Sequence, residues 1–285
     1  MADRRPYNQF IRCATDPQYN PTPIIEDYTM LYRPLFWTAF WCADWLARAR
    51  FRGAKHLLVS SASAKTAFLL AYCVRMAQSG ADRPRLVGLT STRNLAFTQG
   101  LGLYDAVTTY DSFESTEALK VKDRETWIYA DVASDAALNE RIFSHLGNAV
   151  IGAVTLGMST LSPNGASTSA AVQAGANTAL DAQVGPAAAA LAQSVAVRME
   201  PFFMVEWLAV RRKELSVRQI VDMQTRAWSG LMRDCPPWVR IERVYGGEAV
   251  VKAYEEVVNG RLGPNRGFIW SLWDEEEGGR ITAKL

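Results

Sequence analysis

The strongest constraint on this fold is a series of short apolar segments that alternates with amphipathic segments between residues 56 and 155. The apolar segments lack the strict alternation of polar and apolar residues that a half-exposed strand shows. Such strands are typical of a parallel sheet that helices cover on both faces. The sequence therefore predicts an α/β fold with a doubly wound, Rossmann-like parallel sheet. The predicted strands are 56–60, 85–90, 106–110, 126–131 and 149–155.

The remaining segments complete a four-part organisation. Helices are predicted at 64–78, 94–101 and 135–146, the last capped by Ser134, because their apolar residues recur at helical spacing. The first part, 1–50, is an N-terminal strap up to residue 34 followed by an aromatic helix at 35–50, and the second, 51–161, is the Rossmann-like core. The third part, 162–235, is an Ala-rich insertion followed by a strongly helical stretch at 201–234. The fourth part, 236–285, is a closing strand, helix and strand of the core with an acidic tail.

Composition excludes several classes of protein. The chain has 31 Lys and Arg against 29 Asp and Glu, a formal net charge of +2, whereas binding to nucleic acid or an anionic membrane needs a clear cationic surplus. No apolar run is long enough to span a bilayer, and the first residues lack the apolar segment of a secretory signal, so we expect a cytoplasmic protein. Four cysteines without a close pair and two histidines do not supply a zinc site, so no metal is expected.

The most informative segment joins the first predicted strand to the helix after it. Such a turn presents free backbone N–H groups and the positive helix end to a phosphate, and small residues allow a close approach. The usual G-x-G-x-x-G fingerprint is absent, and an ordinary capped helix remains the alternative. The residues expected to hold a pyrophosphate are Ser61, Ser63, Ala64, Lys65 and Thr66.

The end of the second predicted strand bears on which dinucleotide would bind. It reads Thr90-Ser-Thr-Arg-Asn94 and has no acidic residue, whereas an Asp or Glu there would bind the adenosine ribose of NAD. Hydroxyls and a cation suit the additional phosphate of NADP. Ser91 and Arg93 are therefore the predicted phosphate ligands, with an exposed loop arginine as the alternative.

Several motifs together resemble a known family. The runs Leu101-Gly-Leu-Tyr-Asp-x-Val-x-x-Tyr-Asp111 and Tyr129-Ala-Asp-Val-Ala133 are similar to the nucleotide-binding half of quinone-oxidoreductase-like medium-chain dehydrogenases/reductases. Leu31-Tyr-Arg-Pro-Leu-Phe-Trp-Thr38 and Ser60-Ser-Ala-Ser-Ala-Lys-Thr-Ala67 resemble a largely uncharacterised microbial branch of that superfamily. The resemblance implies a dinucleotide-binding Rossmann fold. Only about 50 residues precede the first strand, so we expect the GroES-like catalytic domain of that superfamily to be missing.

The first functional hypothesis is an NADPH-dependent oxidoreductase that reduces a ketone or an activated alkene, in secondary metabolism. Tyr110 is expected on the adenine side, and Asp131, Val132 and Ala133 near the nicotinamide ribose. The candidate catalytic hydroxyls are Tyr32, Thr38 and Tyr129.

Two other hypotheses keep the fold and change the function. A cofactor-free cyclase, isomerase or lyase would use the crevice to fold a small apolar substrate, because such chemistry needs shape more than redox power. A non-catalytic subunit would dock its basic helical segment, 211–233, on an acidic partner. In the oxidoreductase hypothesis, a homodimer is expected, since five aromatic residues within 36–45 and the Ala-rich segment favour an interface.

Overall fold

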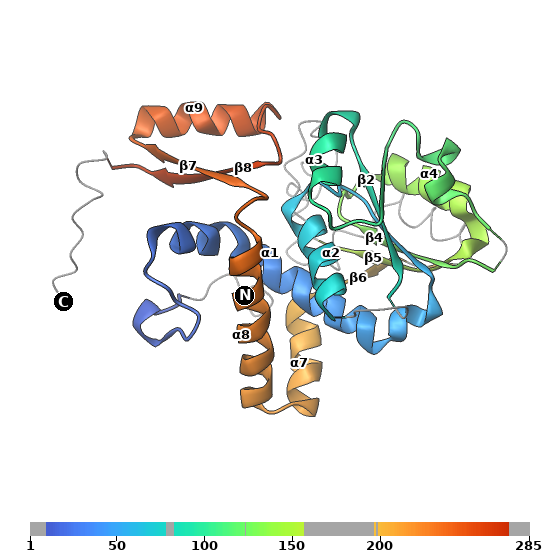
Figure 1. The fold of residues 1–285 in the computed structure, drawn as a ribbon, viewed down its shortest axis with the longest axis horizontal. Coiled ribbons are helices and arrows are strands. Elements are labelled where there is room, and N and C mark those ends of the chain that lie inside the picture. Colours follow the sequence, from blue (N-terminus) through green and yellow to red (C-terminus); the bar gives the residue numbers. More distant parts are fainter. Residues whose placement is uncertain (1–9, 78–82, 123, 157–196, 198, 274–285) are drawn as a thin grey trace, which may run out of the picture.

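A six-stranded parallel sheet forms the centre of the protein (Figure 1). The computed structural model describes residues 10–77, 83–122, 124–156, 197 and 199–273. The strand order is β3-β2-β1-β4-β5-β6, and every adjacent pair is parallel. The Rossmann-like α/β fold predicted from the sequence is therefore confirmed. The strands are β1 (His56–Val59), β2 (Arg85–Thr90), β3 (Ala106–Thr109), β4 (Trp127–Asp131), β5 (Val150–Thr155) and β6 (Met199–Pro201).

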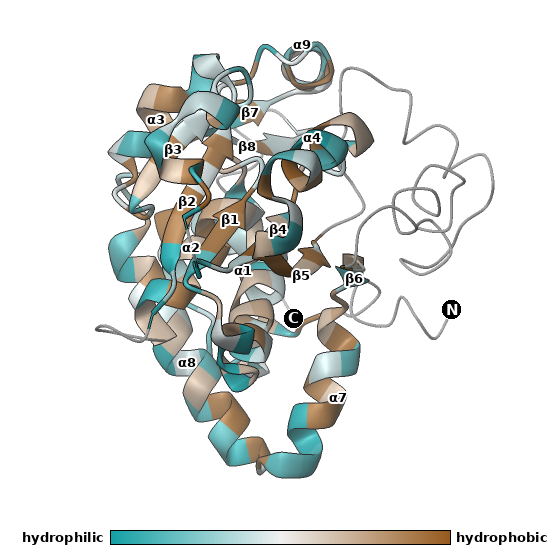
Figure 2. Cartoon of the chain, turned by 90° about the vertical axis from the view of Figure 1, so that its right-hand side faces the viewer, coloured by the Kyte–Doolittle hydropathy of each residue, from teal (hydrophilic) through white to brown (hydrophobic). Residues whose placement is uncertain are grey.

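Helices cover both faces of this sheet, and its central strands β1 and β4 are buried along their whole length. Leu57 and Val59 of β1 pack in a cluster with α1 (Pro23–Arg48) and α2 (Lys65–Ala77), whereas Leu58 packs with α4 (Ala136–Leu146) on the opposite face. Figure 2 shows brown, apolar strands between helices that carry both hydrophilic and hydrophobic residues. The short helix α3 (Leu95–Gly100) follows β2, and the strand order reverses between β1 and β4. Ligands of doubly wound sheets bind at that reversal, outside the carboxyl ends of the strands.

The aromatic helix is much longer than predicted. Helix α1 begins at Pro23, where the sequence predicts an irregular strap up to residue 34, and it runs through Pro34. Proline at the first helical position costs little, because that N–H has no helical partner in any case. The buried side chains of Tyr28, Tyr32 and Phe36 recur every four residues across Pro34, so packing against α2 maintains the helix.

The closing strand, helix and strand do not belong to the central sheet, contrary to the prediction. β7 (Arg240–Tyr245) and β8 (Arg266–Ser271) form their own two-stranded parallel sheet, connected by α9 (Gly247–Val258). This unit lies beyond α2 and α3 from the six-stranded sheet (Figure 1). The unit packs on α1, where Gly267 leaves no room for a Cβ beside Leu31 and Arg243 forms an ion pair with Asp27.

The helical stretch predicted at 201–234 is a pair of helices, α7 (Met204–Glu214) and α8 (Val217–Asp234). They separate at Ser216, whose side chain accepts a hydrogen bond from Gln219 N, while the Gln219 side chain accepts one from Ser216 N. Such a capping box begins a new helix. The predicted Ala-rich segment, 162–197, lies outside the described residues except for its last residue.

Two local predictions need correction. The cap of α4 is Asp135, which accepts hydrogen bonds from Ala137 N and Leu138 N, and not Ser134, which has a positive φ of 52°. Arg211, the first residue of the basic segment that the third hypothesis docks on an acidic partner, is instead buried and forms ion pairs with Asp44 and Glu214 of this chain. Single 3-10 turns occupy Cys13–Thr15, Arg50–Gly53, Thr92–Asn94, Phe113–Ser115, Glu117–Leu119 and Gly147–Ala149. Among the described helices, none has the length and apolar character to cross a membrane.

Candidate functional site

The turn between β1 and α2 lies at the switch point of the sheet. Ser61 has a φ of 49°, in the left-handed region that the first glycine of a dinucleotide-binding turn normally favours. Its N–H donates to the hydroxyl of Tyr110 (3.1 Å), and the two hydroxyls lie 3.3 Å apart. The next amide, Ala62 N, donates to Leu89 O (2.9 Å). Both N–H groups at the start of the turn are therefore already bonded.

The amides that remain belong to the first turn of α2. Phe68 N is the first to donate into the helix, to Ala64 O, so the N–H groups of Lys65, Thr66 and Ala67 precede the helical hydrogen bonds. Ser63 fixes this helix start, because its Oγ accepts from Thr90 Oγ1 (3.2 Å) and Asn94 Nδ2 (3.1 Å). The predicted pyrophosphate residues are thus brought together in one turn and helix start.

Lys65 is held away from bulk water beside this helix start. Its Nζ donates to the carbonyl oxygen of Arg266 in β8 (3.2 Å). Burial disfavours its charged form and lowers the pKa of Lys65 from 10.5 to about 8. A cation at the positive end of a helix is unfavourable as well, and a bound anion would relieve it.

The carboxyl end of β2 carries the predicted NADP residues. Ser91 and the exposed Arg93 follow Thr90 directly, and Arg93 Nη1 donates to Gly260 O after α9 (2.9 Å). An exposed carboxylate, that of Asp111, lies at the same loop and accepts a hydrogen bond from Thr92 Oγ1 (3.0 Å). Ser91 and Arg93 thus lie just after the end of β2, and their role as phosphate ligands stays a prediction.

The carboxyl end of β4 holds a buried carboxylate. Asp131 is 2% exposed, and its oxygens accept from Ser134 N (2.9 Å), Asn139 Nδ2 (2.9 Å) and Ser60 Oγ (3.2 Å). Burial raises the pKa of Asp131, and these hydrogen bonds oppose the increase.

Sequence reasoning missed the role of Ser60 in linking the two strands at the switch point. Its Oγ accepts from the consecutive amides Val132 N (2.9 Å) and Ala133 N (3.1 Å). The only sequence signal was the position of Ser60, directly after an apolar strand.

The three predicted catalytic hydroxyls do not converge. Tyr32 and Tyr129 are both 0% exposed and lie in clusters on opposite faces of the sheet. Tyr129 donates to Asn139 Oδ1 (2.6 Å), and Thr38 donates to Pro34 O (3.2 Å) within α1. Their assignment as proton donors stays a prediction, and the burial of Tyr32 and Tyr129 favours structural roles.

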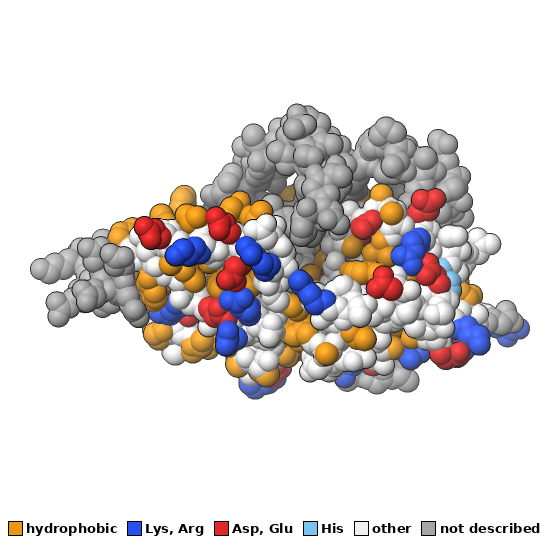
Figure 3. Space-filling model, turned by 90° about the horizontal axis from the view of Figure 1, so that it is seen from above, with side chains coloured by type: hydrophobic (Ala, Val, Ile, Leu, Met, Phe, Trp, Pro, Cys, Tyr) orange, Lys and Arg blue, Asp and Glu red, His pale blue; other side chains and the backbone are white. Residues whose placement is uncertain are grey.

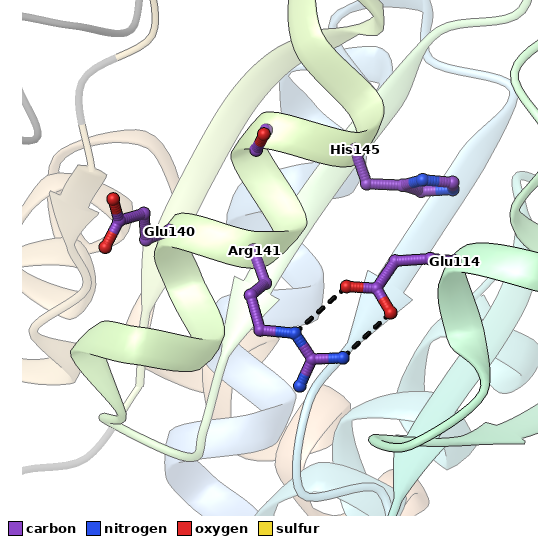
Figure 4. A pocket seen from close by; sticks show the side chains of 5 residues that line it. Glu114, Glu140, Arg141 and His145 are labelled. Carbon is purple, nitrogen blue, oxygen red and sulfur yellow. Dashed lines mark hydrogen bonds and ion pairs between the residues drawn. The ribbon is translucent and has the colours of Figure 1, made fainter.

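A separate open cavity of about 420 Å³ lies on the outer face of α4 (Figure 4). Arg141 forms a two-pronged ion pair there with Glu114 (2.9 and 2.8 Å), and Glu140, Ser144 and His145 complete the lining. The arginine is also bonded to Tyr110 O (2.9 Å), so this surface supports the loop after β3. On the face seen from above, acidic and basic side chains are interspersed over the described surface (Figure 3).

The chain matches a family model over residues 1–263. It belongs to the family described as "Protein of unknown function (DUF2855)". No curated protein matches this DUF2855 chain.

Solved structures are similar in fold. CurA from Vibrio vulnificus in complex with NADPH has a TM-score of 0.51 at 10% identity, over 89% of this chain and 67% of that chain. The yhdH oxidoreductase from Salmonella enterica in complex with NADP has a TM-score of 0.44 at 13% identity, over 82% of this chain and 60% of that chain. The DUF2855 chain thus spans about three fifths to two thirds of the length of these structures. The similarity to CurA shows a shared fold.

Proposed function

We propose that this chain binds NADPH and acts as an oxidoreductase on a ketone or an activated alkene. One observation carries the proposal: β2 ends at Thr90 and is followed by Ser91 and Arg93, where an NAD-binding sheet has a carboxylate at the strand end. The fold is shared with CurA, whose structure contains NADPH, and this supports the proposal.

The residues at the switch point fit a dinucleotide. The free amides of Lys65, Thr66 and Ala67 would hold the pyrophosphate at the start of α2. Ser91 and Arg93 would hold the additional phosphate. The amides of Ser61 and Ala62 are already bonded, so they shape the turn without serving as phosphate ligands.

The bound cofactor would supply reducing power, and the chain would supply binding, orientation and the exclusion of water. A ketone or a polarised alkene would be reduced by NADPH, and these are the substrate classes that we propose. A small apolar substrate would suit a site beside the carboxyl ends of β1 and β4, where doubly wound sheets bind their ligands. The short contacts between Ser60, Val132 and Ala133 would keep these two strand ends at a fixed separation.

A comparison of thermal shifts tests the proposal. NADPH at about one hundred times its Kd should stabilise the protein by about 2.7 kcal/mol. NADH at the same concentration should raise the melting temperature much less, because it lacks the phosphate that Arg93 would bind. Equal shifts with both cofactors would contradict the predicted preference, and negligible shifts with both would remove the cofactor from the function.

The bonded amides of Ser61 and Ala62 favour a second candidate, a cofactor-free cyclase, isomerase or lyase. In this case Tyr110 would close the phosphate turn permanently, and the crevice would bind only an apolar substrate. Binding of NADPH to the unmodified protein would exclude this function.

A further inference from the structure

The phosphate turn keeps a glycine-type conformation although it contains no glycine. Ser61 sits in the left-handed region, with a φ of 49°, where any residue with a Cβ is strained. Local hydrogen bonds must therefore hold this backbone in place.

Tyr110 supplies those bonds from the end of β3. Its hydroxyl accepts from Ser61 N (3.1 Å) and lies 3.3 Å from Ser61 Oγ. Burial raises the pKa of Tyr110, so the hydroxyl is neutral and both donates and accepts at physiological pH. A serine at position 61 gives this hydroxyl a second partner that a glycine would lack.

Tyr104 holds the next residue from the other side. Its hydroxyl donates to Ala62 O (3.0 Å), while Ala62 N donates to Leu89 O (2.9 Å). The methyl group of Ala62 fits because Gly88 has no side chain: a Cβ at Gly88 would lie 2.9 Å from Ala62 Cβ and 3.0 Å from the Tyr104 ring.

We infer that Tyr110 and Tyr104 are positioning residues that replace the missing glycines, holding residues 60–64 so that the start of α2 faces the dinucleotide. This inference rests on the proposed NADPH function. It assigns the tyrosines no contact with the cofactor.

The test is a set of single and double variants titrated with NADPH by fluorescence. Tyr110→Phe should weaken binding at least fivefold, because the turn loses both hydrogen bonds at Ser61. In a Ser61→Gly background the same change should cost less than twofold, since glycine adopts the left-handed conformation without help. Tyr104→Phe should weaken binding both with serine and with glycine at position 61, because it removes the hydroxyl that donates to Ala62 O.

The control is Tyr28→Phe, which removes a hydroxyl bonded to Pro236 O away from the turn and should leave the affinity unchanged. The inference would be wrong if Tyr110→Phe left the affinity for NADPH unchanged, or if it reduced the affinity equally with serine and with glycine at position 61. In either case NADPH binding by the unmodified protein would still support the proposed function.

A second readout separates the two proposals. Hydrogen exchange of the amides in residues 61–66 of the free protein should accelerate in Tyr110→Phe and return towards the unmodified rate in Ser61→Gly/Tyr110→Phe. If no variant binds NADPH but exchange follows this pattern, the cofactor proposal fails and the role of Tyr110 in the turn is retained. If exchange is the same in all variants, the inference about Tyr110 is wrong whatever the cofactor.

Discussion

Lys65 Nζ donates a hydrogen bond to Arg266 O across 3.2 Å, and this bond joins the start of α2 to the outer strand β8. The residues are 201 positions apart in the chain. The two-stranded sheet thus takes part in the candidate site, because it covers the one lysine that sits at the phosphate turn. Arg93 makes a similar contact with Gly260 O, so both cations of the site reach the unit formed by β7, α9 and β8.

Burial of Lys65 predicts a pH dependence of stability. Its pKa is about 8 in the folded protein against 10.5 unfolded, so the unfolded state binds more protons between these values. The free energy of unfolding should therefore rise by about 2 kcal/mol between pH 7 and about pH 9.5, relative to Lys65→Met. Urea unfolding at both pH values measures this difference. Lys252→Met, at an exposed position on α9, should keep the pH dependence of the unmodified protein.

Arg93 should determine the choice of cofactor. Arg93→Ala removes the cation at the end of β2, and we expect NADPH binding to weaken about tenfold, a typical loss for a charge-assisted hydrogen bond. NADH binding should change less than twofold. Arg85→Ala, at the opposite end of β2, serves as the matched control. An equal loss of affinity for both cofactors would show that Arg93 supports the fold and does not select the phosphate.

The core of the fold was predictable because burial on both faces forces strands to be apolar throughout. This pattern placed β1 to β5 within one or two residues, and the position of each strand end brought Ser61, Ser91 and Asp131 to one edge. Helix α1 was not predictable to the same degree. Pro34 has the local chemistry of a helix break, and only packing of Tyr32 and Phe36 against α2 overrides it.

The place of the closing unit depended on information that strand patterns do not contain. The residue pattern of β7 and β8 predicts two strands but does not indicate to which sheet they belong. The observed contacts with α1 join residues more than 200 positions apart, as between Gly267 and Leu31 and between Arg243 and Asp27. Likewise the sequence predicts Tyr110 beside the adenine, which stays a prediction, whereas the hydrogen bond between Tyr110 and Ser61 depends on the tertiary fold. The predicted homodimer and the partner hypotheses stay predictions.

Asp131 should be a major contributor to stability. Asp131→Ala leaves the buried side-chain donors of Asn139 and Ser60, and the N–H of Ser134, without their acceptor, and we expect a loss of about 2 to 4 kcal/mol in the free energy of unfolding. Asp111→Ala removes an exposed carboxylate with one hydrogen bond and should change stability by about 0.5 kcal/mol or less. Chemical denaturation of the two variants gives the comparison, and similar losses would contradict a special role for the buried group.

Gly88 should tolerate no larger residue while Ala62 is present. A Cβ at Gly88 would come within 2.9 Å of Ala62 Cβ and 3.0 Å of the Tyr104 ring, closer than such atoms approach without a shift of the backbone. Gly88→Ala should therefore reduce the free energy of unfolding by about 1 to 3 kcal/mol. Ala62→Gly removes one side of the clash, so the double variant should recover part of that loss. Urea unfolding of both single variants and the double variant measures the coupling. If the losses in free energy of unfolding from Gly88→Ala and Ala62→Gly were simply additive in the double variant, the contact between residues 62 and 88 would not limit the packing between β2 and the turn.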